Sequence, residues 1–220
     1  MNARARAIAI SVILFSLLTY LFAWSPIFEV RSIATEGLPQ EVSAASIVSK
    51  SKIEIGQKLS RIEPRSVERT LGELSWVKNV SVQRQWWGGK VIVKVTPRIA
   101  VGIYKNQAID SSGTLFALPG KTPPGLPVVS ASTPELGLEA IALFTDLPLE
   151  LRDNVISLSA ASENSISSWQ QWGGQKLKVT WGTSREIDLK VTVLQALLQL
   201  PENKAIKRVD LSAPHAPIVK

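Results

Sequence analysis

Cysteine is absent from this chain of 220 residues, and histidine occurs once, at His215. The first absence excludes disulfide bridges, a thiolate nucleophile and any zinc site built on cysteine. A lone histidine without cysteine does not favour zinc binding either. A serine triad would have to use His215, which lies between Pro214 and Pro217, and the nucleophile motif G-x-S-x-G is also missing.

Nucleotide-binding motifs are missing as well. The sequence has neither a Walker phosphate loop nor a G-x-G-x-x-G turn, and its carboxylates are scattered. Asp110 stands just before a Ser-Ser-Gly turn, where an Asx turn explains it better than acid catalysis. The composition is compatible with a Ser-Lys dyad, but no pair is singled out. We therefore expect a protein that is not an enzyme and has no metal or cofactor.

Charge of one sign is only mildly in excess. The net charge is +7, and the positive residues are spread along the chain in ones and twos. A dispersed pattern is typical of a solvated basic surface, whereas a nucleic-acid-binding face would cluster Lys and Arg. Hydrophobic residues make up 45% of the chain, which is ample for a packed core. These features predict a folded protein that does not bind nucleic acid.

Residues 7–28 form a run without any charged side chain. As a helix, this run would reach about 33 Å, enough to cross a hydrocarbon core of about 30 Å. Arg4 and Arg6 precede it and no positive excess follows, so the positive-inside rule places the N-terminus in the cytoplasm. A cleaved signal peptide would end in small residues, whereas this run ends in LFAWSPIF. We expect a cytoplasmic tail over 1–6 and an uncleaved anchor over 7–25, with the rest outside the cell membrane.

The segment that follows the anchor alternates between strand and helix patterns. A strand is predicted over 28–36, a short helix over 41–50, and a helix over 64–74 with Pro64 in its first turn. Two segments in which apolar and polar residues alternate then flank Gly88 and Gly89. Glycine readily adopts the positive φ angles that a tight hairpin turn requires. The order strand, helix, helix, strand, strand predicts two helices on one face of a three-stranded sheet.

The remainder is predicted to be mainly strands with two helices. One helix is expected over 136–147, capped near Thr133. The other is expected over 186–200, where apolar residues recur at helical spacing, namely Leu189, Val193, Leu197 and Leu200. A strand, a proline-flanked bend and a further short strand are expected to close the chain. The other strands are predicted over 99–105, 107–110, 114–118, 153–161 and 170–182. The predicted fold class is α+β.

Five of the seven tryptophans could stack on sugars or bases, namely Trp86, Trp87, Trp169, Trp172 and Trp181. Aromatic residues of small sheets, however, usually pack in the core. We expect core positions for Trp76, Trp86 and Trp181. Trp87 falls on the polar face of the hairpin, so Trp87 and the nearby Arg84 are the candidates for surface contacts.

Several motifs together resemble the FtsQ/DivIB family of bacterial cell-division proteins. The hairpin LSWVKNVSVQRQWWGGKVIVKVTPR carries most of the likeness, and SPIFEVRSIATEG, IEIGQKLSRIEP, AIDSSGTLF and RVDLS resemble other family motifs in the same order. The resemblance covers nearly the whole chain. It implies a POTRA domain over 27–97 and, over 98–220, a β domain of mainly antiparallel sheet with flanking helices.

The resemblance also implies a function. It implies a non-catalytic, single-pass scaffold at the division septum, essential for septum formation, that links early and late division proteins. The implied partners are membrane proteins of the FtsB and FtsL type and the septal peptidoglycan synthase complex. In this family a partner strand extends the sheet edge of the last strands, and such backbone pairing needs little side-chain identity. The corresponding positions are Val209, Asp210, Leu211, Ser212, Ala213, His215, Ile218 and Val219.

The sequence departs from the family pattern at several positions. Ser75 stands where the family has a proline before Trp76, and Ser212 stands in place of an arginine. Pro214 and Pro217 cannot donate hydrogen bonds to a ladder, so the terminal edge is expected to be shorter than usual.

Two other classes of function are left open. The tryptophans and the positive charge would suit an exported enzyme or glycan-binding domain that acts on the cell wall. The small domain would suit a POTRA-type transport component, although such proteins usually repeat the unit or carry a membrane barrel. Only one such unit and one apolar helix are predicted here.

Overall fold

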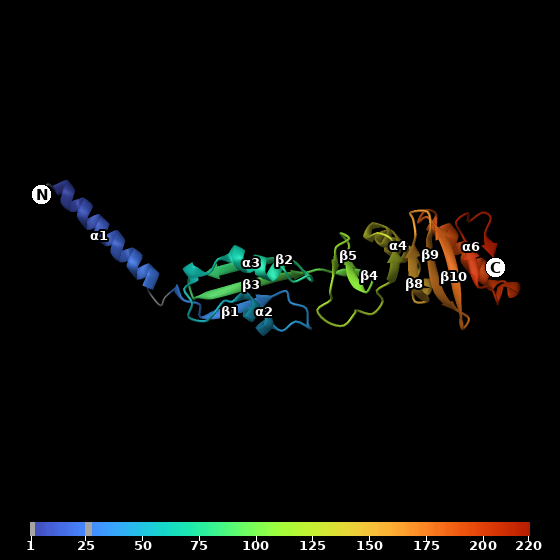
Figure 1. Ribbon diagram of the computed structural model, residues 1–220, viewed down its shortest axis with the longest axis horizontal. Coiled ribbons are helices and arrows are strands. Elements are labelled where there is room, and N and C mark those ends of the chain that lie inside the picture. Colours follow the sequence, from blue (N-terminus) through green and yellow to red (C-terminus); the bar gives the residue numbers. More distant parts are fainter. Residues whose placement is uncertain (1–2, 25–27) are drawn as a thin grey trace. The chain divides into compact units, whose positions relative to one another are not determined.

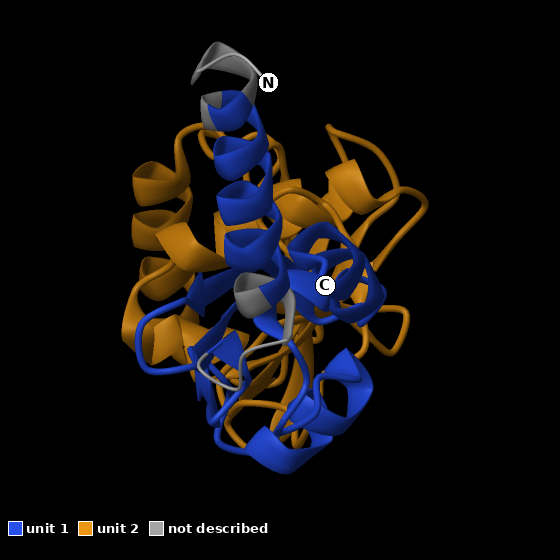
Figure 2. Cartoon of the chain, turned by 90° about the vertical axis from the view of Figure 1, so that its left-hand side faces the viewer, with its two compact units in different colours: residues 1–98 blue, residues 99–220 orange. Residues whose placement is uncertain are grey.

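The computed structural model describes residues 3–24 and 28–220, and the chain divides into two compact units, residues 1–98 and 99–220. Figure 2 colours these units separately. The first element is helix α1 (Ala3–Trp24) (Figure 1). Among the described residues, no helix has both the length and the apolar character that a membrane crossing requires. The anchor predicted over 7–25 is therefore not confirmed, and Ser25 lies outside the described residues.

The first unit has the predicted order of strands and helices. Its sheet has the strand order β1-β3-β2, with β1 parallel and β2 antiparallel to β3. The two helices pack against each other, and α2 also contacts β1 while α3 contacts β2. This confirms the expected two-layer α+β arrangement. The elements are β1 (Ser32–Glu36), α2 (Ala44–Ser51), the short 3-10 helix η2 (Leu59–Arg61), α3 (Pro64–Gly72), β2 (Val77–Gln85) and β3 (Lys90–Pro97).

Local sequence signals explain the boundaries of these elements. Ser43 caps α2, because its hydroxyl accepts a hydrogen bond from the backbone N–H of Ser46 at 3.2 Å. Pro64 lies in the first turn of α3, where its missing N–H has no helical partner to lose. Gly88 and Gly89 turn the hairpin with φ angles of 93° and 67°, as predicted.

The second unit is one mixed sheet of nine strands in the order β12-β11-β10-β9-β8-β7-β4-β5-β6. Five of its neighbouring pairs are antiparallel and three are parallel, so the sheet is mainly antiparallel, as predicted. The strands are β4 (Ala100–Tyr104), β5 (Gln107–Asp110), β6 (Leu115–Phe116), β7 (Val128–Ala131), β8 (Val155–Ala160), β9 (Ile166–Trp172), β10 (Gln175–Gly182), β11 (Arg208–Asp210) and β12 (Ile218–Val219).

Helices connect two of the three parallel pairs of this sheet, whereas β4 reaches its parallel neighbour β7 through β5, β6 and a loop. The 13-residue helix α4 (Pro134–Asp146) joins β7 to β8, followed by the single turn α5 (Leu149–Arg152). Helix α6 (Ile187–Gln199) and the 3-10 turn η3 (Pro201–Asn203) join β10 to β11. Such crossovers are what parallel pairing demands. Strand β7 is absent from the sequence-based prediction, because four residues after a Pro-Gly loop carry too little periodicity.

Three of the four tryptophans discussed above lie as predicted. Trp76 and Trp181 are 8% and 0% exposed, and Trp87 is 84% exposed. The core position predicted for Trp86 is wrong, since its side chain is 36% exposed. Strand β2 ends at Gln85, so Trp86 falls in the turn and is no longer held on the core face.

The Asx turn at Asp110 is confirmed. Its Oδ1 accepts hydrogen bonds from the backbone N–H groups of Ser112 and Thr114 at 2.9 and 3.0 Å. The carboxylate is buried and satisfies the orphan donors of the hairpin between β5 and β6. Its role in the structure is to form this turn.

Helix α6 is present as predicted, but the face that it buries differs from the predicted apolar face of Leu189, Val193, Leu197 and Leu200. The residues that it buries are Lys190, Val191, Leu194 and Leu198. Leu200, which the sequence pattern placed on the apolar face, is 41% exposed. A lysine on the buried face hides the true periodicity, because apolar positions alone define the sequence pattern.

Lys190 gives a pH-dependent prediction. Its side chain is 1% exposed, and its Nζ donates to the carbonyl oxygen of Thr183 at 2.8 Å. Burial lowers the pKa of this ammonium, an effect that Glu186 partly opposes. In the folded state the proton is therefore lost at a lower pH than in the unfolded state, where the pKa is about 10.4. The contribution of Lys190 to the free energy of unfolding consequently rises with pH in the range between its lowered pKa and its ordinary pKa.

We expect Lys190→Met to unfold at a urea concentration no lower than wild type at neutral pH, because the buried charge is removed and the volume is kept. The alkaline rise in stability should be smaller than in wild type. Urea titrations across the alkaline range measure both effects, with Lys176→Met, at an exposed position, as the matched control. Strong destabilisation of Lys190→Met would instead show that the bond to Thr183 outweighs the burial of the charge.

Candidate partner-binding edge

The residues predicted to bind a partner lie at one end of the nine-stranded sheet. Strand β10 pairs in parallel with β11, at Lys178 opposite Arg208 and Val179 opposite Val209. Strand β11 pairs antiparallel with β12, at Val209 opposite Val219. Among the described strands, β12 is the last one at this end of the sheet. These three strands build the candidate site.

Strand β11 is not an open edge, because the end of the chain covers it. The N–H of Lys220 donates to the carbonyl oxygen of Arg208 at 3.0 Å. In return, the carbonyl oxygen of Lys220 accepts from the N–H groups of Arg208 and Lys207, both at 2.9 Å. The available edge is therefore shorter than the predicted one from Val209 through Val219, because β12 alone presents it.

The backbone of Val219 points away from β11. In an antiparallel ladder, residues that exchange both hydrogen bonds with the partner strand alternate with residues whose N–H and C=O face the other way. Lys220 exchanges both bonds with Arg208. Val219 is the next residue, so its N–H and C=O are directed to the side of β12 on which no described strand pairs. This is one outward donor and one outward acceptor at a sheet edge.

The side chains of the predicted site divide into buried and exposed sets. Val209 and Leu211 are 1% and 0% exposed and belong to the core of the second unit. Ile218 and Val219 are 55% and 36% exposed. A partner can therefore contact the second pair but not the first. Of the other predicted positions, Ser212, Ala213 and His215 are exposed.

A tight bend folds β12 back onto β11. The Oδ1 of Asp210 accepts hydrogen bonds from the backbone N–H and the hydroxyl of Ser212 at 2.9 and 2.6 Å. The N–H of Ala216 then donates to the carbonyl oxygen of Ala213 at 2.9 Å. Asp210, predicted as a contact residue, thus holds the bend. Pro214 is buried inside the bend, where its lack of an N–H costs no ladder bond.

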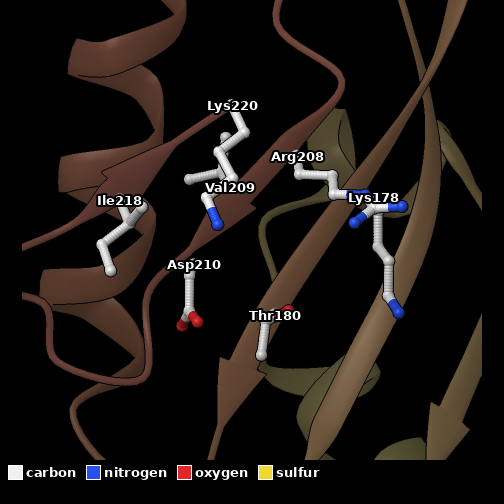
Figure 3. Close-up of a pocket in the computed structure, with 7 residues that line it drawn as sticks. All are labelled: Lys178, Thr180, Arg208, Val209, Asp210, Ile218 and Lys220. Carbon is white, nitrogen blue, oxygen red and sulfur yellow. The ribbon is translucent and has the colours of Figure 1, made fainter.

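Cations gather beside this edge, and sequence reasoning missed them. A hollow of about 230 Å³ is lined by Lys178, Arg208 and Lys220 together with one carboxylate, that of Asp210. Figure 3 draws these residues as sticks. The first two are 30 residues apart and meet only because β10 and β11 pair in parallel. The excess of positive charge suits an acidic partner segment. The full lining is Lys178, Thr180, Arg208, Val209, Asp210, Ile218 and Lys220.

The two surface candidates of the first unit differ in their environments. Trp87 is exposed, as described above. Arg84 is half-buried, and its Nη1 donates to the carbonyl oxygens of Leu59 and Ile62 at 3.2 and 2.9 Å. Its guanidinium also lies 5.2 Å from the ring centre of Trp86. Arg84 thus ties η2 to the hairpin, a structural role that its predicted surface role did not include.

No metal site is evident in the part of the chain that the structure describes, where no group of three or more His, Asp or Glu side chains could hold an ion. The single histidine, His215, is exposed in the terminal bend. The chemistry of the described edge is that of backbone hydrogen bonding, apolar contact and positive charge.

Comparison with protein families gives two matches that together span most of the chain. Residues 28–98 match the FtsQ-type POTRA domain, and residues 98–212 match the C-terminal domain of the cell division protein FtsQ/DivIB. The second match ends within the bend, ahead of β12. No curated protein matches the chain.

Proposed function

Because the chain belongs to the FtsQ/DivIB family of cell-division proteins, we propose that it is a scaffold of the bacterial divisome that links early and late division proteins at the septum. We propose that it is not an enzyme and that septum formation requires it. Its partners are single-pass proteins of the FtsB and FtsL type, and through them the septal peptidoglycan synthase complex. The observation that carries the proposal is the outward-facing backbone of Val219 on β12, the last described strand at this end of the sheet.

Strand addition at β12 is the mode of binding that this edge supports. An extended partner segment would accept a hydrogen bond from the N–H of Val219 and donate one to its carbonyl oxygen. The exposed side chains of Ile218 and Val219, which point to opposite faces of the sheet, offer apolar contact to that segment. Acidic residues of the partner would lie near Arg208 and Lys220, where they speed association and set the register.

We also propose that α1 anchors the protein in the cytoplasmic membrane, with the N-terminus inside and residues 28–220 outside. Residues 7–28 contain no charge, and large apolar side chains of α1 are exposed, among them Ile8, Phe15 and Leu17 at 65%, 73% and 55%. Exposed apolar surface of this extent on a helix of 22 residues favours a lipid environment. The POTRA domain then comprises residues 27–97, and the β domain residues 98–220.

Depletion of the protein tests the proposed function. We expect depleted cells to grow into filaments without septa, and a fluorescent fusion of the full chain to concentrate at the division site. Normal division after depletion, together with a uniform distribution of the fusion, would contradict the proposal. Tight and saturable binding of the purified protein to cell-wall sacculi would favour the alternative of a glycan-binding or hydrolytic protein.

A further inference from the structure

The turn between β2 and β3 carries an exposed aromatic cluster. Trp87 is 84% exposed and Trp86 36%, and both pack on Phe28, which is 9% exposed. The ring centre of Phe28 lies 6.1 Å from that of Trp86 and 6.2 Å from that of Trp87. Trp87 therefore presents most of a large amphipathic ring to its surroundings, on a rigid base.

The tip of this hairpin is fixed to the segment that follows α1. The carbonyl oxygen of Gly89 accepts hydrogen bonds from the N–H groups of Arg31 and Ser32 at 2.7 and 3.3 Å. A Cβ atom at Gly89 would lie 2.3 Å from the carbonyl oxygen of Glu29, so the two backbones approach as closely as glycine allows. The cluster therefore cannot move away from residues 28–32 without breaking the fold.

Chain length limits the distance between this cluster and α1. Phe28 follows Trp24, the last residue of α1, by four residues. A fully extended chain covers at most about 3.6 Å per residue, so Phe28 lies within about 14 Å of the end of the helix. This limit holds for every orientation of the first unit. If α1 spans the membrane, this limit keeps the cluster within reach of the outer headgroup layer, which is about 5 to 7 Å thick.

We propose that Trp87 inserts its ring into the outer headgroup region of the phospholipid bilayer and so gives the first unit a second contact with the membrane. The inference rests on the anchor in the proposed function. A tryptophan ring prefers this layer, because its apolar body leaves water while its N–H keeps a hydrogen-bonding partner. Arg31, exposed beside Gly89, is placed to contact lipid phosphates. The contact restricts the tilt of the POTRA domain above the membrane.

The absence of cysteine from the chain allows a single label to test this contact. The full-length variant Gln85→Cys, reconstituted in phosphatidylcholine vesicles, carries a nitroxide at an exposed site beside the tip while both tryptophans stay in place. Asn79→Cys is the matched control, exposed on the same strand and about 20 Å away at about 3.3 Å per residue. Accessibility to oxygen, which enriches in lipid, and to a water-soluble nickel complex is measured by electron paramagnetic resonance.

We expect the label at position 85 to be more accessible to oxygen and less accessible to nickel than the label at position 79. Adding Trp87→Ser should remove that difference, and Trp87→Tyr, which keeps an amphipathic ring, should restore most of it. Equal accessibility at the two positions, or a difference that Trp87→Ser leaves intact, would overturn the inference and leave the proposed function standing. If the chain fails to float with the vesicles, the anchor is wrong and the inference falls with it.

Discussion

Val219→Pro is expected to abolish capture of an FtsB-type partner segment while the protein stays folded. The N–H that proline removes is the one directed away from β11, so every hydrogen bond between β11 and β12 is kept. The partner strand loses its donor, and the proline ring occupies the path along which that strand must approach. Both effects act on binding alone.

Binding of the full-length protein to the exported segment of the partner measures this effect, with the thermal midpoint as the test of folding. Val219→Thr is the matched control, because it keeps the N–H and the branched shape, and it should bind nearly as wild type. Capture of the partner by Val219→Pro at wild-type affinity would rule out strand addition at β12. Leu211, by contrast, is unsuitable for such a test, because its side chain is 0% exposed and a charge there would unfold the unit.

Trp181→Ala is expected to lower the free energy of unfolding of the second unit by about 3 to 5 kcal/mol. Trp181 is 0% exposed on β10, and its Nε1 donates to the hydroxyl oxygen of Ser168 at 2.9 Å. The Nε2 of Gln170 donates to the same hydroxyl at 3.2 Å. Alanine leaves a large cavity and removes one of the two donors of this buried polar group, so packing and hydrogen bonding are lost together.

Urea titration of the full-length protein measures this loss. Trp169→Ala is the control, since Trp169 lies on the adjacent strand β9 but is 40% exposed, and it should lose clearly less stability. Equal effects of the two substitutions would mean that Trp181 is not the packing centre of this sheet. Because β10 holds β11 in register, the urea concentration at which partner capture is lost should fall together with the midpoint of unfolding.

Local patterns in the sequence were sufficient to predict most elements of both units. The turn at Gly88 and Gly89, Pro64 in the first turn of α3 and the Asx turn at Asp110 all lie where expected. Each of these signals acts over a few neighbouring residues, through φ preference or a hydrogen bond to the nearby backbone. The family resemblance supplied the location of the candidate site at the end of the chain.

Pairing between distant segments decided the rest. The folding of β12 onto β11, the buried face of α6 with Lys190, and the gathering of Lys178, Arg208 and Lys220 depend on contacts across the sheet and the helix crossover. Strand register is set by which residues share a core face, and no local period of the sequence specifies the partner strand. By itself the sequence determined most of the elements and their order. Only the tertiary structure decided that Val219 of β12 carries the outward backbone groups, since that depends on which strand pairs with β11.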